Sequence, residues 1–442
     1  MQFNSVLFLF CFFPLFLAVY YLFPRSWRNG LLVLGSLVFY YYAGSNKFLV
    51  LGLLIGTTLF TWLVGRGLWR KRPLLLAFGL CVLLGLLAAL KYYDGGRYLV
   101  AGLSFYLFQQ AAYLIDAYRR AVEPEGNLIR YSAQIMMFPK VLMGPLTDPA
   151  DIQRQVRCPE FSFENFHRGL QELVLGLCLK VLLSDRIGGL WAQAGTIGYE
   201  NLSTPFAWIA LVSFAMRLYF DFWGYSVMAR GIGHMLGFHL PENFLDPYAS
   251  GSVSEFWRRW HATLGTWFRK YLYIPLGGNR KGTMRTLLNL LVVWLFTGLW
   301  HGTGGNYILW AMILFFFVMN ERLWLRHVLE AVGPVRYLYT VLVILLSWVP
   351  FAIGDWGSMV IFFQKLFGTG LPALNPADYI PWLRDYLWLL LAGVVCATPV
   401  PRYVWNKIRG SALTDVLIFA LFWVVVYFIC TSAQDPFMYF QY

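Results

Sequence analysis

Charged side chains are scarce in this sequence. They make up 13% of the 442 residues, whereas soluble domains contain about 25%. This scarcity excludes an ordinary soluble domain, because too few charges remain to cover a surface that faces water. Hydrophobic residues account for 59% of the chain and aromatic residues for 19%, and the mean hydropathy is +0.57. We therefore expect an all-α, polytopic integral membrane protein that forms a single domain over residues 1–442.

Several motifs that carry chemistry in other proteins are also missing. Six cysteines are present without a CxxC pair, which argues against a disulfide-rich or zinc-ribbon fold. The sequence has no GxSxG nucleophile elbow, no HExxH motif, and no close cluster of His, Asp and Glu. We therefore expect no metal site, no bound cofactor and no serine-hydrolase chemistry.

The basic residues form short clusters. The formal net charge is +13, but the clusters lie in alternate connections between apolar runs, so we do not expect nucleic-acid binding. Clusters of this kind mark cytoplasmic loops and suit anionic membrane lipids. The alternation predicts that both termini lie outside the cytoplasm. The first apolar run, residues 3–23, lacks a basic n-region and a small-residue cleavage site, so we expect it to be kept as a span and not cleaved as a signal peptide.

Long apolar runs follow one another almost to the end of the chain. Because about 20 apolar residues suffice to cross a bilayer as a helix, we expect about 11–12 transmembrane helices. The candidate spans are residues 3–23, 30–43, 47–65, 73–92, 98–118, 166–184, 205–229, 286–301, 305–321, 337–353, 386–396 and 413–431.

Two apolar stretches carry breaks that are unusual in a spanning helix. Residues 131–149 contain Pro139, Gly144 and Pro145, and residues 252–276 run into a Pro-Leu-Gly-Gly sequence. Non-helical backbone persists at membrane depth only where protein or a water-filled cavity satisfies its hydrogen bonds. We therefore expect both stretches to be re-entrant or interfacial segments that line a site.

The second broken stretch is rich in basic and aromatic residues. It reads SEFWRRWHATLGTWFRKYLYIPLGGNRKG over residues 254–282, and the charge alternation places it on the cytoplasmic side. Basic side chains bind phosphate oxygens, so the segment could bind a phosphate-bearing donor such as a coenzyme A thioester. The alternative, which composition alone favours, is an interfacial segment anchored to anionic lipid. The candidate donor-binding residues are Trp257, Arg258, Arg259, Trp260, Arg269 and Lys270.

Three ionisable residues lie in apolar or aromatic surroundings. His301 follows Arg285 by 16 residues, which is about 24 Å along a helix and deep within a membrane core of about 30 Å. A histidine there is a functional candidate, because neutral imidazole can take a proton from a hydroxyl; the alternative is a buried histidine that donates to a carbonyl. His261 is more often structural in such a setting. For Asp221 we expect an ion pair with Arg217, one turn earlier.

Taken together, several motifs resemble the membrane-bound O-acyltransferases, in particular their bacterial alginate O-acetyltransferase branch. The pairing of FWRRWH with GLWHG some forty residues later is especially specific. The matching motifs are FNSVLFLFCFFP at 3–14, FPKVLMGP at 138–145, YFDFWGYS at 219–226, LGFHLPENF at 236–244, EFWRRWH at 255–261, YLYIPLGGNRKG at 271–282, GLWHG at 298–302 and PFMYFQY at 436–442.

The resemblance implies a helical fold around a central tunnel. Peripheral helices would occupy about residues 1–130, a catalytic core about 131–330, and C-terminal helices about 331–442. It implies that His301 is the family's active-site histidine and that His261 is a second family histidine nearer the cytoplasm. The tunnel and donor site would also include Trp300, Asn306 and Asp221.

The resemblance also implies the reaction. An acetyl group would pass from cytoplasmic acetyl-CoA to a hydroxyl of an exported polysaccharide, often through an extracytoplasmic partner protein, at the bacterial inner membrane. Residues 356–385 form a long connection that could dock such a partner. Three alternatives stay open: transfer of D-alanine from a carrier protein to teichoic acid, a polysaccharide or lipid transporter without chemistry, and a structural subunit of an export complex.

Overall fold

The computed structural model describes residues 1–42, 46–92 and 102–431. All regular secondary structure in these ranges is helical, which confirms the predicted all-α class. The PFMYFQY motif and the first residues of the predicted 98–118 span lie outside the described residues. The chain divides into two compact units, and the division into one domain with three regions stays a prediction.

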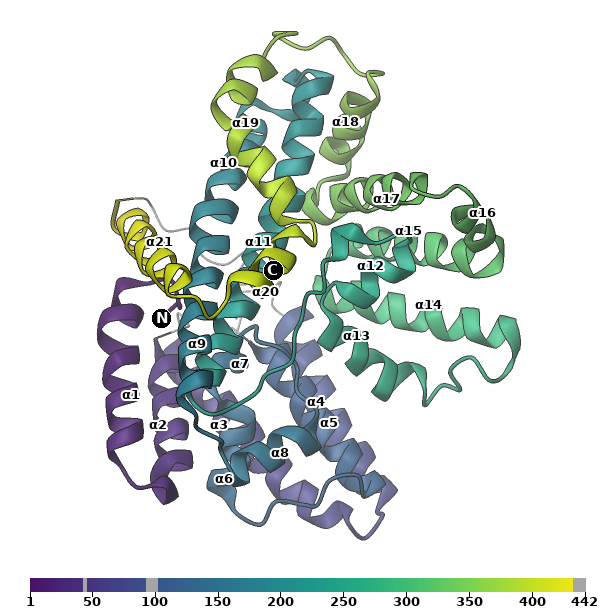
Figure 1. Ribbon diagram of the computed structural model, residues 1–442. Coiled ribbons are helices and arrows are strands. Elements are labelled where there is room, and N and C mark those ends of the chain that lie inside the picture. Colours follow the sequence, from purple (N-terminus) through teal and green to yellow (C-terminus); the bar gives the residue numbers. More distant parts are fainter. Residues whose placement is uncertain (43–45, 93–101, 432–442) are drawn as a thin grey trace. The chain divides into compact units, whose positions relative to one another are not determined.

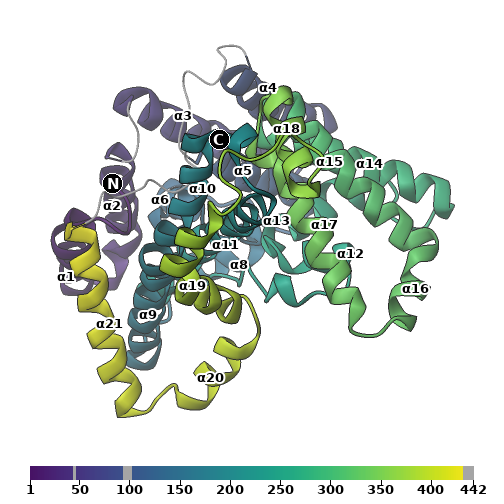
Figure 2. The ribbon, with the colours of Figure 1, turned by 90° about the horizontal axis from the view of Figure 1, so that it is seen from above.

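The first unit comprises residues 1–178, 224–242 and 418–441. Its helices include α1, α2, α3, α4 and α5, and the last part of α21 lies beside α1 (Figures 1 and 2), where the rings of Phe10 and Phe422 are 6.0 Å apart. Its elements are η1 (Leu7–Phe12), α1 (Phe13–Leu22), η2 (Arg25–Trp27), α2 (Arg28–Tyr41), α3 (Lys47–Leu68), α4 (Pro73–Tyr92), α5 (Leu103–Arg119), α6 (Leu128–Met136), α7 (Phe138–Val141), α8 (Pro149–Arg157) and α9 (Phe163–Leu177).

The second unit comprises residues 179–223 and 243–417. Its elements are η3 (Cys178–Ser184), α10 (Asp185–Ile197), η4 (Tyr199–Asn201), α11 (Thr204–Met235), η5 (Pro247–Ala249), α12 (Val253–Arg259), α13 (Ala262–Phe268), η6 (Arg269–Tyr273), α14 (Gly282–His301), α15 (Gly305–Asn320), η7 (Glu321–Leu325), α16 (Arg326–Ala331), α17 (Val335–Ala352), α18 (Trp356–Phe367), α19 (Tyr379–Cys396), α20 (Val400–Ile408) and α21 (Ala412–Thr431). The end of α11 and most of α21 belong to the first unit.

The apolar runs of the sequence form helices throughout the described residues. Eight of the described helices are long and apolar enough to cross a membrane, and Leu7–Leu22 is a shorter apolar helix. The protein is therefore an integral membrane protein. The spanning candidates are Lys47–Leu68, Pro73–Tyr92, Thr204–Met235, Gly282–His301, Gly305–Ala331, Val335–Ala352, Tyr379–Cys396 and Ala412–Thr431.

The helix is interrupted in both of the stretches where the sequence predicts a break. In the first, α6 ends at Met136 and α7 restarts with Pro139 in its first turn, as expected because proline lacks the amide that a helix interior requires. In the second, α12 and α13 are separated at His261, whose φ of +45° lies in the left-handed region. Whether either stretch enters the membrane stays a prediction.

Phenylalanine side chains build the core around the FPKVLMGP motif in the first unit. The ring of Phe138 lies 5.7 Å from Phe12, 5.3 Å from Phe16 and 5.4 Å from Phe39. Its backbone amide donates to the hydroxyl of Ser36 at 3.0 Å. These contacts fix the irregular backbone of α7 against α2, which satisfies a polar group that helix packing alone would leave exposed to hydrocarbon.

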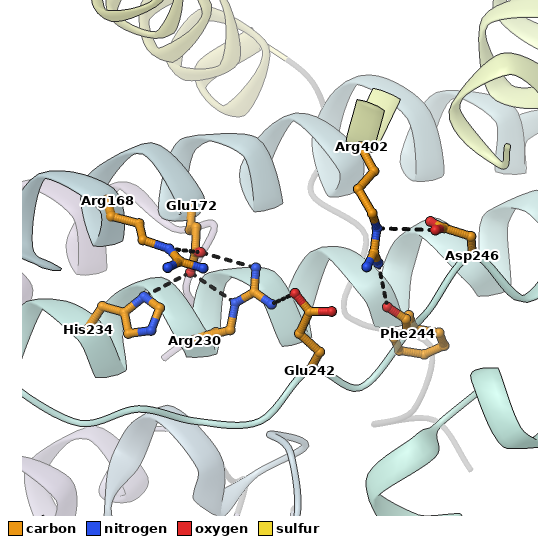
Figure 3. A network of polar contacts seen from close by, with 8 residues as sticks. All are labelled: Arg168, Glu172, Arg230, His234, Glu242, Phe244, Asp246 and Arg402. Carbon is orange, nitrogen blue, oxygen red and sulfur yellow. Dashed lines mark hydrogen bonds and ion pairs between the residues drawn. The ribbon is translucent and has the colours of Figure 1, made fainter. Parts of the chain in front are cut away.

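Helices α9 and α11 approach each other closely in the first unit. A Cβ atom added at Gly169 would lie 2.4 Å from the carbonyl oxygen of Gly231, and one added at Gly176 would lie 2.6 Å from that of Gly224. Between these contacts, Glu172 of α9 pairs with Arg230 at 3.0 Å and with His234 at 3.1 Å (Figure 3). Glycine at these positions therefore allows the two backbones to touch around a buried carboxylate.

Candidate active site

His301 is the last residue of α14, at the turn into α15. The close contact of these helices depends on Gly298, because a Cβ there would lie 2.9 Å from the carbonyl oxygen of Tyr307. The imidazole is 8% exposed. Its ring centre lies 4.5 Å from Trp300, 4.9 Å from Trp310 and 5.1 Å from Phe351. The predicted histidine is therefore walled by aromatic rings, where an electrostatic interaction is stronger than in water.

His261 occupies the break between α12 and α13. Its Nδ1 lies 2.9 Å from Oδ1 of Asn243, and Phe222 of α11 packs against its ring at 4.7 Å. The side chain is buried, and burial lowers the pKa of His261 to about 3 because the charged imidazolium loses its hydration. At neutral pH His261 is therefore an uncharged imidazole.

Trp300 brings the two predicted histidines together. Its ring centre lies 4.5 Å from that of His301 and 6.3 Å from that of His261. Both imidazoles thus contact one indole, although 40 residues separate them in sequence. The sequence predicted each histidine separately, and the structure places both rings against Trp300.

Further tryptophans extend this aromatic wall. The ring of Trp257 lies 5.3 Å from Trp294 and 5.5 Å from Trp310, and Trp260 lies 5.3 Å from Trp348. Trp257, Trp260 and Trp300 are therefore parts of one cluster beside His301. Their role in shaping a tunnel stays a prediction.

The candidate basic residues differ in their exposure and in the contacts that their charged groups already make. Arg258 and Arg269 are exposed, whereas Arg259 pairs with Glu255 at 2.5 Å. The ammonium group of Lys270 lies 5.1 Å from the ring centre of Tyr271. Arg258 and Arg269 are consequently better placed than Arg259 to meet an anion from solution.

Two other predicted residues have partners that the sequence did not indicate. Asp221 pairs with Lys180 at 2.7 Å, and Lys180 also contacts Asp185 at 2.6 Å; the pairing of Asp221 with Arg217 stays a prediction. Asn306 donates to the carbonyl oxygen of Pro350 at 2.9 Å. Both residues therefore link elements of the second unit, and their place at the donor site or tunnel stays a prediction.

Sequence reasoning missed three buried polar residues. Asn243 contacts His261, and Glu321 accepts hydrogen bonds from the amides of Val253 and Ser254 at 2.7 and 2.8 Å. In the first unit, the ammonium group of Lys140 donates to Gln109 at 2.5 Å and to Thr147 at 2.9 Å. Asn243 and Lys140 lie in motifs that carried the resemblance, so their polarity among apolar neighbours was an available signal.

Comparison with known proteins identifies the family. The model of the membrane-bound O-acyltransferase family matches residues 74–348. The chain belongs to that family. The chain is 32% identical to the probable alginate O-acetylase AlgI of Pseudomonas putida over 100% of both chains. It is also 31% identical to the peptidoglycan O-acetyltransferase of Helicobacter pylori, over 70% of this chain and 68% of that protein.

A more distant relative is a D-alanyltransferase. The teichoic acid D-alanyltransferase of Bacillus subtilis is 24% identical over 48% of this chain and 56% of that protein. Family membership and these relatives make this membrane-bound O-acyltransferase an enzyme of acyl transfer. The transporter and structural-subunit alternatives are therefore set aside.

Proposed function

We propose that this membrane-bound O-acyltransferase moves an acetyl group from acetyl-CoA in the cytoplasm to an extracytoplasmic acceptor at the bacterial inner membrane. The acceptor is a hydroxyl of an exported polysaccharide, reached directly or through a partner protein. The observation that carries the proposal is the convergence of His301 and His261 on Trp300, in a chain that matches an alginate O-acetylase over its full length.

In this proposal His301 is the general base. Its neutral imidazole takes the proton of the acceptor hydroxyl while the hydroxyl oxygen attacks the thioester carbonyl. The carbon–sulfur bond then breaks, and the leaving thiolate receives the proton from the imidazolium. The aromatic wall around His301 excludes water, which would otherwise compete with the acceptor as a nucleophile.

The donor is held in this proposal by the exposed basic side chains of the α12–η6 segment. Arg258 and Arg269 meet the phosphates of acetyl-CoA, because guanidinium groups bind phosphate oxygens in a bidentate manner. Trp257 and Trp260, which belong to the cluster beside His301, line the path of the thioester arm. No resident cofactor takes part, and acetyl-CoA is a substrate.

The test uses purified protein in nanodiscs with radiolabelled acetyl-CoA and a candidate polysaccharide acceptor. His301→Ala should lower thioester turnover by roughly 10²–10⁴-fold, the usual contribution of a general base. His327→Ala is the matched control, because His327 is an exposed histidine of α16, and it should retain wild-type turnover. Equal turnover in wild type and His301→Ala would refute the role of His301.

The distant D-alanyltransferase relative supports a second candidate function, the transfer of D-alanine. In that case the donor would be D-alanine on the phosphopantetheine of a carrier protein. The same nanodiscs should then turn over the loaded carrier and leave acetyl-CoA untouched. Turnover of acetyl-CoA without a carrier protein decides for the acetyl donor.

A further inference from the structure

Three donors converge on one oxygen atom of Asn243. Its Oδ1 lies 2.9 Å from Nδ1 of His261, 2.8 Å from the hydroxyl of Thr263 and 3.3 Å from the backbone amide of Thr263. Asn243 is 2% exposed, so water does not compete for these bonds. One of these donors, His261, has a left-handed backbone and contacts Trp300 beside His301. Helix packing alone does not explain why its ring is held in this way.

The contacts determine which nitrogen of His261 carries the proton. A backbone amide can only donate, so the Asn243 atom that faces the amide of Thr263 is the carbonyl oxygen. The same oxygen faces Nδ1 of His261, which must then donate as well. A neutral imidazole with its proton on Nδ1 has its lone pair on Nε2.

The backbone around Asn243 is built to hold this arrangement. The amide of Ala262 donates to the carbonyl oxygen of Asn243 at 2.9 Å, and the amide of Leu245 donates to that of Arg259 at 3.0 Å. Three residues after Asn243, Asp246 is bound by Arg402 at 3.1 Å (Figure 3). The segment is thus anchored on both sides of the break, which offsets the cost of a positive φ at His261.

The groups around His261 keep it uncharged. The rings of Phe222 and Trp300 contact its imidazole, and Asn243, which faces Nδ1, is neutral. On neighbouring elements, Asp221 of α11 is paired with Lys180 and Arg259 of α12 with Glu255. His301 of α14, across Trp300, is the titratable group that shares its aromatic contact. Burial accordingly lowers the pKa of His261 to about 3.

We propose that Asn243 is a positioning residue that locks His261 in the Nδ1–H tautomer and so presents Nε2 to the substrate as a hydrogen-bond acceptor. The proposal rests on the proposed function, in which His261 serves the transfer. A hydroxyl or amide hydrogen of the substrate would be received at Nε2. A histidine side chain in water favours the opposite tautomer, with the proton on Nε2, so the carbonyl of Asn243 is needed to reverse this preference.

The tautomer is read directly by NMR of protein labelled with ¹⁵N-histidine. His261→Gln assigns the signal, and wild type should show a protonated Nδ1 and an unprotonated Nε2 at neutral pH. Asn243→Leu should move the signal toward the Nε2–H form. Thr263→Val is the matched control: it removes another donor to the same oxygen and should leave the tautomer unchanged.

Activity provides the second readout. Asn243→Leu should lower kcat by about tenfold or more with little change in KM for the donor, because the wrong tautomer fails in the reaction and not in binding. Asn243→Asp should restore the tautomer. Its carboxylate should also raise the pKa of His261, so the acidic limb of the kcat profile should move to higher pH.

The outcomes separate this proposal from the proposed function. A wild-type signal with the proton on Nε2, or an unchanged tautomer in Asn243→Leu, would overturn the positioning role. An unchanged kcat in Asn243→Leu would also overturn it. If wild type fails to use any thioester while the NMR shows the expected tautomers, the proposed function is wrong. The effect of Asn243 on the tautomer of His261 is then still supported.

Discussion

Replacing Glu321 with alanine should loosen the short helix that carries Trp257 and Arg258. The Glu321 carboxylate is 4% exposed. It accepts the amides of Val253 and Ser254 at the start of α12, and the hydroxyl of Tyr339 at 3.2 Å. These amides belong to the first turn of α12, where no helical partner exists for them.

The size of the effect follows from these bonds. A hydrogen bond to a charged group contributes about 1.5–3 kcal/mol, and a buried donor left without an acceptor adds its own cost. Allowing for partial relaxation, Glu321→Ala should lower the free energy of unfolding by roughly 3–5 kcal/mol. For a domain of about 200 residues this corresponds to a fall of roughly 10 °C in the thermal midpoint.

The assay compares thermal midpoints of detergent-solubilised variants. Glu330→Ala is the control, because Glu330 lies in the same stretch but its side chain is 53% exposed and pairs on the surface with Arg326; its midpoint should barely change. Thioester turnover should fall in Glu321→Ala at temperatures where the variant remains folded. Equal midpoints for Glu321→Ala and Glu330→Ala would refute the argument that Glu321 holds α12.

Two further predictions concern Lys140 and Gly302. Burial lowers the pKa of Lys140 to about 7, whereas in the unfolded chain the ammonium keeps its proton up to about pH 10.5. Stability should therefore rise between about pH 7 and 10, and Lys140→Met should abolish this rise in thermal midpoint. A Cβ at Gly302 would lie 2.0 Å from the ring of Tyr307, so Gly302→Ala should displace that ring and cost about 1–3 kcal/mol. Gly354→Ala, with nothing within 4 Å, should be neutral in the same unfolding assay.

The helices were largely predictable from the sequence because apolar length is a local property. The run 73–92 became α4 (Pro73–Tyr92) without change, and 286–301 became the end of α14. Shorter or more polar helices such as α10 and α18 were missed, since their residues lack a long apolar run. Part of the connection expected over 356–385 is therefore the helix α18, and docking of a partner there stays a prediction.

The site was only partly predictable. His301 and His261 were both predicted as candidates, because a histidine among tryptophans and glycines is easily recognised in the sequence. Their shared contact with Trp300 depends on how α12, α13 and α14 pack. Sequence distance also hid one partner of Asp221, because Lys180 lies in η3, far from Asp221 along the chain. Such partners are determined by tertiary packing, which the spacing of residue types along the sequence does not reveal.

The glycine contacts between α9 and α11 also affect how this chain can diverge. Gly169 and Gly176 are seven residues apart, as are Gly224 and Gly231, so the contacts recur after two helical turns with the helices antiparallel. A methyl group at Gly169, Gly176 or Gly231 meets a carbonyl oxygen of the other backbone, which no change of rotamer relieves. A larger residue at one of these positions cannot be accommodated by a smaller residue on the facing helix, because the facing residue is already glycine. Among proteins that descend from this one, we expect the four positions to change last and to change together with Glu172.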